Sequence, residues 1–181
     1  MKSNKITFLI SEVILGLLLL LCVFLIFSDE KPQKRVAVIV ERSGDEKWDS
    51  FINGIKQAAR EKNIHLIICN TDEIEDAQEE KSLITEQMDN QVDAFIIQAA
   101  PGTDTAAMLS ETSTQKPVIL VSNNIQSQYS DLPFTGPDDY LMGYTLGEDL
   151  VARNPSDSEG KKVGIISGYK DTCCAGERTR G

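Results

Sequence analysis

The sequence predicts an α/β fold in which helices cover both faces of a parallel sheet. Short apolar runs alternate with amphipathic segments over most of the chain, and these runs are apolar throughout rather than at every second residue. Strands that are apolar on both sides are typical of a sheet buried on both faces, and helices between them form the crossovers of a parallel sheet.

The alternation begins after residue 35 and continues through four strands. Val36–Val40, "VAVIV", is the first predicted strand, and apolar residues from Trp48 to Ala59 then recur at helical spacing. The predicted elements that follow are the strand His65–Cys69, the helix Asp76–Asp89, the strand Asp93–Ile97, the helix Asp104–Thr112 and the strand Pro117–Val121.

The chain then changes character at "FTGPDD", Phe134–Asp139, which predicts a short extended piece and a turn. A helix over Tyr140–Arg153 and a strand over Lys162–Ser167, "KVGIIS", are expected to follow. Right-handed crossovers between these strands give a Rossmann-like sheet, and ligands of such sheets bind in the crevice beyond the carboxyl ends of the strands.

Residues Ile6–Phe27, "ITFLISEVILGLLLLLCVFLIF", predict a transmembrane helix that anchors the chain. As a helix they span about 33 Å, enough to cross a hydrocarbon core, although Glu12 interrupts the run. A cleaved signal peptide is the main alternative, but Ile26-Phe27-Ser28 lacks the small residues that cleavage needs; a buried helix is the third. The short flank 1–5, the anchor 6–27 and the linker 28–34 predict a single-pass protein of the cell membrane with an extracytoplasmic domain.

Charge and cysteine usage exclude several classes of protein. The chain has 18 Lys+Arg against 28 Asp+Glu, a net charge of -10, which repels nucleic acid. The four cysteines are Cys22, Cys69 and the adjacent pair Cys173 and Cys174, and they form neither a framework of spaced pairs nor a metal-ligand pattern. We therefore expect no nucleic-acid partner, no metal and no cofactor.

No catalytic motif is present, so we expect a protein that is not an enzyme. The sequence has no G-x-S-x-G elbow, no phosphate-binding G-x-x-x-x-G-K-[ST] loop and no G-x-G-x-x-G after the first strand. Its single histidine, His65, begins a strand. The acidic residues Glu75, Asp76, Glu79 and Glu80 are expected to be solvated on one helix face.

Polar side chains and one aromatic ring gather instead at the predicted binding edge. They are Asp45, Trp48, Gln98, Asp104, Ser122, Asn123, Asn124 and Asp139. Carboxylates and amides bond sugar hydroxyls, and an indole packs on the C–H face of a sugar ring. The pattern favours a carbohydrate ligand. In the alternative interpretation, Trp48 is a core residue that packs the first helix on the first strand.

The ordered series of phrases "VAVIV…KWDSFINGIKQAAREKNIHLII", "VDAFIIQAAPGTD", "KPVILVSN", "GPDDYLMGYTLGEDL" and "KVGIISG…ERTRG" resembles a known family. It is similar to the type I periplasmic sugar-binding proteins, the ribose and galactose binders of ABC importers, and to the ligand domain of lactose-repressor-type regulators. The resemblance covers Arg35–Gly181. It implies two α/β lobes joined by a hinge: the first lobe at 35–135, and the hinge crossing with a truncated start of the second lobe at 136–181.

The resemblance also implies ligand contacts. Trp48 stands where the family has a sugar-stacking aromatic residue, Asp45 where it has a polar contact, and Asp139 at the hinge-side contact. Ser122 and Asn123 replace the family's Asp-Arg pair after the fourth strand. Arg178 is the candidate for the family's binding arginine.

These inferences lead to an extracytoplasmic carbohydrate-binding protein, the solute-binding component of an ABC sugar importer with a permease as its partner. The alternative is a sugar sensor that works with a membrane receptor kinase. A regulator of transcription would need a helix-turn-helix in its first ~60 residues, where the apolar segment lies instead. With most of the second lobe missing, we expect weak sugar binding.

Overall fold

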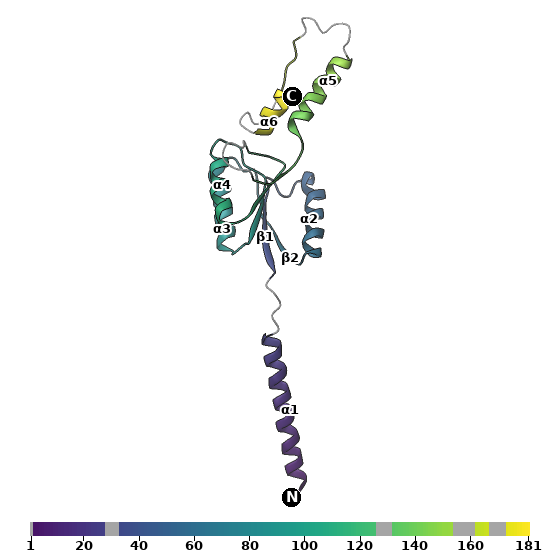
Figure 1. Ribbon diagram of the computed structural model, residues 1–181, viewed down its shortest axis with the longest axis vertical. Coiled ribbons are helices and arrows are strands. Elements are labelled where there is room, and N and C mark those ends of the chain that lie inside the picture. The colour runs from purple at the N-terminus through teal and green to yellow at the C-terminus, as the bar shows by residue number, and fades with distance from the viewer. Residues whose placement is uncertain (1, 28–32, 126–131, 154–161, 167–172) are drawn as a thin grey trace. The chain divides into compact units, whose positions relative to one another are not determined.

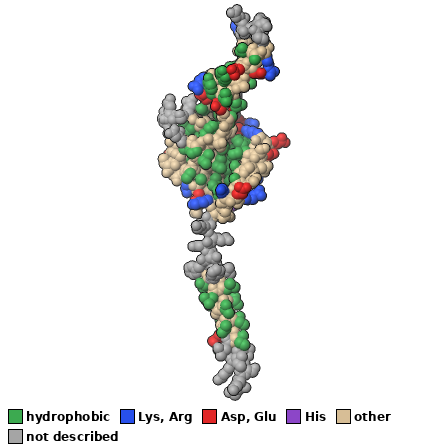
Figure 2. All heavy atoms as spheres, turned by 45° about the vertical axis from the view of Figure 1, so that its right-hand side comes forward, with side chains coloured by type: hydrophobic (Ala, Val, Ile, Leu, Met, Phe, Trp, Pro, Cys, Tyr) green, Lys and Arg blue, Asp and Glu red, His purple; other side chains and the backbone are tan. Residues whose placement is uncertain are grey.

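The computed structural model describes residues 2–27, 33–125, 132–153, 162–166 and 173–181 (Figure 1). They form two units, Met1–Gln33 and Lys34–Gly181. The first unit contains the helix α1 (Lys2–Phe27), whose described apolar side chains, Phe8 and those from Ile10 to Val23, are exposed (Figure 2). In the described part of the chain, no helix has both the length and the apolar character that a membrane span requires. The crossing expected at 6–27 therefore stays a prediction.

The second unit contains the predicted parallel sheet. Its strands are β1 (Lys34–Ile39), β2 (Ile64–Ile68), β3 (Ala94–Ile97), β4 (Val118–Val121) and β5 (Phe134–Thr135). Their order in space is β2-β1-β3-β4-β5, and all pairs are parallel. The α/β prediction is confirmed, and each of the first four strands lies within two residues of its expected bounds.

Helices cover both faces of this sheet, as expected. The helices are α2 (Asp49–Glu61), which follows the short helix η1 (Glu46–Trp48), then α3 (Ala77–Asp89) and α4 (Thr105–Gln115). Figure 1 shows α2 on one side of the strands and α3 with α4 on the other. Strand β1 supplies both cores because its side chains alternate: Val38 packs with Trp48 on the α2 side, whereas Ile39 packs with Leu109 on the other.

Beyond the first lobe, α5 (Asp139–Arg153) and α6 (Cys173–Arg180) pack against each other. The two backbones approach closely at Gly143, where a Cβ atom would collide with the carbonyl oxygen of Arg178. Helix α6 was not predicted. The division between a first lobe ending at 135 and a crossing at 136 stays a prediction.

Two expectations about local structure were wrong. The described part of the strand expected at Lys162–Ser167, residues 162–166, is not paired into a sheet, and Ser167 lies outside the described residues. Val163, Ile165 and Ile166 are exposed there, because the five paired strands of the described chain all belong to the first lobe. Glu80, expected to be solvated, is fully buried.

Candidate ligand-binding site

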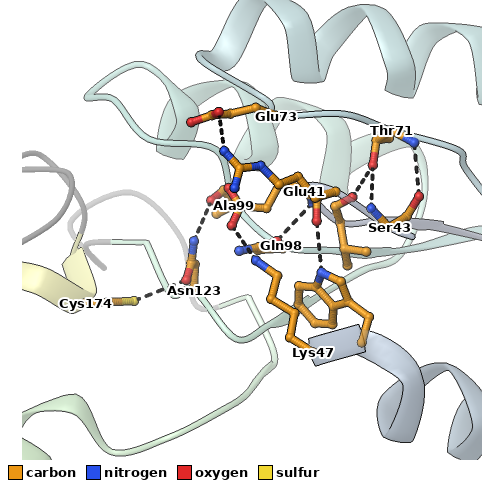
Figure 3. Close-up of polar contacts among 12 residues, drawn as sticks. Glu41, Ser43, Lys47, Thr71, Glu73, Gln98, Ala99, Asn123 and Cys174 are labelled. Atoms are coloured by element: carbon orange, nitrogen blue, oxygen red, sulfur yellow. Dashed lines mark hydrogen bonds and ion pairs between the residues drawn. The ribbon is translucent and has the colours of Figure 1, made fainter. Parts of the chain in front are cut away.

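The first loop after β1 is held by the loop after β2. The backbone N–H of Arg42 donates to the carbonyl of Asp72 at 2.7 Å, and the N–H of Thr71 donates to Oγ of Ser43 at 3.0 Å. Arg42 adopts a left-handed conformation (φ 46°), and its guanidinium pairs with Glu73 at 2.5 Å. The hydrogen bond and the paired carboxylate raise the pKa of Arg42. These bonds fix the segment that carries Asp45 and Trp48 (Figure 3).

Trp48 is 7% exposed and belongs to the core on the α2 side of the sheet. Its indole Nε1–H donates to the carbonyl of Glu41 at 2.9 Å, and its ring meets Phe51 edge-on at 5.6 Å. Lys47 places its ammonium 5.4 Å from the centre of the indole and pairs with the Glu41 carboxylate at 2.9 Å. A stacking platform would leave the indole partly exposed before a sugar binds. This indole is buried because both its N–H and its ring find partners within the loop and the first helix.

Gln98 lies at the topological switch point of the sheet, between the carboxyl ends of β1 and β3. From β1 the chain crosses to β2 on one side, whereas β3 joins β1 on the other, and a crevice opens at the carboxyl ends of two such strands. The buried Oε1 of Gln98, just after β3, accepts a hydrogen bond from the backbone N–H of Glu41, just after β1, at 3.0 Å. One amide therefore ties the two sides of the crevice together.

Ser122 and Asn123 follow β4 and face the segment after β3. Ser122 is left-handed (φ 64°), a conformation that costs a non-glycine residue free energy and is common at functional sites. Its N–H donates to the carbonyl of Thr135 at 3.1 Å. Nδ2 of Asn123 donates to the carbonyl of Ala99 at 3.3 Å (Figure 3). The turn thus presents an amide at the same edge as Gln98.

Asp139 and Arg178 form an ion pair at this edge. Nε of Arg178 lies 2.6 Å from Oδ1 of Asp139, whose side chain is 8% exposed. Between this pair and Asn123 lies the thiol of Cys174, which donates to Oδ1 of Asn123 at 3.7 Å. Burial raises the pKa of Cys174 above its ordinary value. A hydrogen bond from the backbone of Asn124 opposes the rise, and the hydrogen bond with the Asp139 side chain adds to it.

The structure thus brings four of the six predicted ligand residues together: Ser122, Asn123, Asp139 and Arg178, which are joined through Cys174. Asp45 is exposed and Trp48 is buried, and both lie on the first loop of the same sheet edge. Sequence reasoning missed Cys174. It was treated only as a cysteine, and the adjacency of two cysteines gave no sign that one of them would contact Asn123.

The acidic and sulfur-containing side chains of the described segments do not form a group of three or more that would hold a metal ion. The polar atoms of the site are instead amides, a hydroxyl, a carboxylate and a guanidinium, which form hydrogen bonds with a polar organic ligand. The expected absence of a metal stays a prediction.

Comparison with known proteins identifies the family. Residues 36–181 match the model of the periplasmic binding protein domain. No characterised protein sequence matches the chain.

Several solved structures share the fold at low identity. A glucose-galactose binding protein from Geobacillus stearothermophilus has a TM-score of 0.71 and 20% identity over 83% of this chain and 52% of its own. An ABC transporter solute-binding protein from Burkholderia multivorans has a TM-score of 0.68 and 20% identity over 82% of this chain and 54% of its own. The transcription regulator CcpA of Lactococcus lactis has a TM-score of 0.64 and 19% identity over 82% and 51%.

The chain thus spans about half the length of these structures. The resemblance to type I periplasmic sugar-binding proteins is confirmed by the family model and by the fold. Over residues 36–181, the chain belongs to the periplasmic binding protein domain family.

Proposed function

We propose that the protein binds a carbohydrate at the edge formed by Ser122, Asn123, Asp139 and Arg178. The observation that carries the proposal is that Cys174 of α6 contacts the backbone carbonyl of Ser122 and the side chain of Asn123, while Arg178 of the same helix pairs with Asp139. The family is one of binding proteins. Two similar structures are described as a glucose-galactose binding protein and as a solute-binding protein in complex with D-arabinose.

The chemistry of these side chains suits a neutral sugar. Asn123 offers both an acceptor and donors, Asp139 accepts two hydroxyl groups, and the Arg178 guanidinium donates in a fork. Because Asp139 and Arg178 already neutralise each other, the pair receives a neutral polyol without leaving a buried charge uncompensated. Asp45, which is exposed, and Trp48, which is 7% exposed, are the further contacts that we propose on the first loop.

In the wider role that we propose, the protein is the solute-binding component of an ABC sugar importer and acts without catalysis. This rests on the similar structure from Burkholderia multivorans, which is described as an ABC transporter solute-binding protein. None of the observations above favours the receptor-kinase alternative. A role like that of the Lactococcus lactis regulator is disfavoured because the apolar helix α1 occupies the place of a DNA-binding module.

We also propose that α1 anchors the protein in the cell membrane with the domain outside. The support is the apolar sequence Ile6–Phe27, which is continuous except for Glu12. The full chain is expected in the membrane fraction after an alkaline wash. Recovery of a soluble chain with a new N-terminus near Ser28 would contradict the anchor.

Calorimetry with D-glucose, D-galactose, D-arabinose and D-ribose on the full chain tests the ligand. We expect one of them to bind with at least millimolar affinity, roughly 4 kcal/mol. Asn123→Ala should weaken this binding by about 1–3 kcal/mol, since a sugar hydroxyl would lose its hydrogen bond with the Asn123 amide. Asn53→Ala, on the exposed surface of α2, is the control. Equal affinity in both variants would contradict the proposed site.

A further inference from the structure

Glu80, on α3, is completely buried (0% exposed) beside the end of β3. Its Oε1 accepts a hydrogen bond from the backbone N–H of Ala100 at 3.1 Å. Its Oε2 has no hydrogen-bond partner in the described chain. A buried carboxyl group with an unpaired oxygen costs stability relative to an apolar residue of the same size. Packing alone therefore gives no reason for an acidic residue at this position.

The bond from Glu80 reaches the ligand edge through one peptide group. The N–H of Ala100 and the carbonyl of Ala99 belong to the same peptide plane, and that carbonyl accepts the bond from Nδ2 of Asn123 at 3.3 Å. A trans peptide is planar, and its N–H and C=O point in opposite directions. Glu80 and Asn123 therefore hold one rigid group from its two ends, and hydrogen bonds in such a chain polarise one another.

The far end of this chain of bonds is the proposed sugar site. Oδ1 of Asn123 accepts from the thiol of Cys174 in α6 at 3.7 Å, and Ser122 contributes its carbonyl oxygen to the same thiol at 3.9 Å. Figure 3 shows Asn123 between Ala99 and Cys174. Two bonds thus fix the orientation of the Asn123 amide: its Oδ1 accepts from the Cys174 thiol, and its Nδ2 donates to the Ala99 carbonyl. That carbonyl belongs to the peptide group that Glu80 holds.

We propose that Glu80 is a positioning residue for the sugar site, which fixes the side-chain amide of Asn123 through the Ala99–Ala100 peptide group and changes the strength of that hold when it gains or loses its proton. The effect on sugar binding rests on the proposed function. The link from Glu80 to Asn123 does not.

The surroundings of Glu80 allow this carboxyl to titrate near neutral pH. Burial raises its pKa to about 8, and the Ala100 N–H opposes the rise. Helix α3 packs against α4 and β1. The ionisable groups on these elements and on α3 itself, all exposed or half-exposed, are Lys34, Arg35, Glu79, Lys81, Glu86, Asp89 and Glu111. None of them contributes to the shift, so the proton on Glu80 responds to pH on its own.

Nuclear magnetic resonance of the full chain tests the proposal without a ligand. In the wild-type protein we expect the backbone amide of Ala100 and the side-chain amide of Asn123 to move together with pH, with one midpoint near 8. Glu80→Gln keeps a carbonyl oxygen for Ala100 but has no titrating proton, so both signals should stay constant. Glu86→Gln, which removes an exposed acid from the same helix, should titrate like the wild type.

Movement of Ala100 without Asn123 would overturn the proposal, as would constant signals in the wild type or an unchanged titration in Glu80→Gln. If Glu80→Gln does not fold, the titration of the Ala100 and Asn123 signals in the wild-type protein still tests the proposal. A second measurement compares D-galactose and D-glucose affinity below and above the midpoint. We expect a several-fold change in the wild type and none in Glu80→Gln, and an equal affinity at both pH values would overturn the coupling. Failure of every sugar to bind would refute the proposed function, and the resonance titration would still decide the positioning role.

Discussion

Trp48 joins the first helix to the sheet, and its contacts lie almost entirely within the protein. The ring packs among Val38, Val40 and Phe51, and the N–H bonds the backbone of Glu41. Residue type and spacing predicted that this tryptophan lies just beyond the carboxyl end of β1, where the structure has it. They gave no means of deciding how deep the ring would lie, because burial depends on the neighbouring strand and on the path of the loop.

We expect Trp48→Ala to lower the free energy of unfolding by about 3–5 kcal/mol, the usual cost of removing a large buried aromatic side chain. Urea unfolding of the full chain measures it. Trp48→Phe should cost less, because it retains a ring and loses the bond to Glu41. An unchanged stability, together with weaker sugar binding, would instead identify the indole as a stacking platform.

Glu80 should make stability depend on pH. Its pKa is about 8 in the folded chain and near the ordinary 4.5 when unfolded. Between these values the folded state holds a proton that the unfolded state has released, so the free energy of unfolding falls as pH rises, by about 1.4 kcal/mol per pH unit. Below and above this window Glu80 contributes no slope.

Urea unfolding across this pH window checks the prediction. Glu80→Gln should lose the slope that Glu80 contributes, and Glu86→Gln, an exposed acid on the same helix, should retain it. Identical slopes in Glu80→Gln and the wild type would show that the carboxyl does not stay protonated in the folded chain.

Among the elements, those of the first lobe could be predicted from the sequence because each carries its own pattern. β1 to β4 are short apolar runs, and α2 to α4 have apolar residues at helical spacing, so local sequence and tertiary packing agree. The segment 162–166 has the same apolar pattern but no neighbouring strand in the described chain. A strand is defined by its pairing, which the segment's own residues do not determine.

The candidate site, too, has features that the sequence could predict and features that it could not. The positions of Ser122, Asn123 and Asp139 at the carboxyl edge followed from the order of elements, since parallel strands end at the same edge. The pairing of Arg178 with Asp139, and the contact of Cys174 with Asn123, depend on how α6 packs. Helix α6 has too few apolar residues for its sequence to predict that packing.

Two glycines of α5 offer a matched test of the contact between α5 and α6. Gly143→Ala would place a methyl group against the Arg178 carbonyl, whereas Gly147 has open space around it. We expect Gly143→Ala to destabilise the contact by about 1–3 kcal/mol and to separate Asp139 from Arg178. Gly147→Ala should stabilise α5 by up to about 1 kcal/mol.

Tryptic cleavage after Arg178 and Arg180 reports on this contact, because both residues lie in α6. Cleavage should be faster in Gly143→Ala and unchanged in Gly147→Ala. Equal rates in the two variants would mean that α5 and α6 separate without cost.

For the whole molecule, apolar surface lies open beyond the first lobe. Leu141, Leu146 and Val151 of α5 are exposed, as are Ile165 and Ile166. Exposed apolar side chains offer binding positions for apolar probes. We expect the full chain to enhance the fluorescence of the dye anilinonaphthalene sulfonate, and Leu146→Gln combined with Val151→Gln to reduce the enhancement. An unchanged fluorescence enhancement in the double variant would show that the dye binds to another surface.

The place of β1 in the sheet has a consequence for the order of synthesis. This strand is made first, yet it lies between β2 and β3, and its residues Ala37–Ile39 are fully buried. Its second neighbour is made about 60 residues later, which at 5–20 residues per second takes about 3–12 s. During that interval a strand with three fully buried residues leaves the ribosome with at most one partner. Ribosome-bound chains arrested before Ala94 should therefore be digested by protease in this strand, and chains arrested after β5 should be protected.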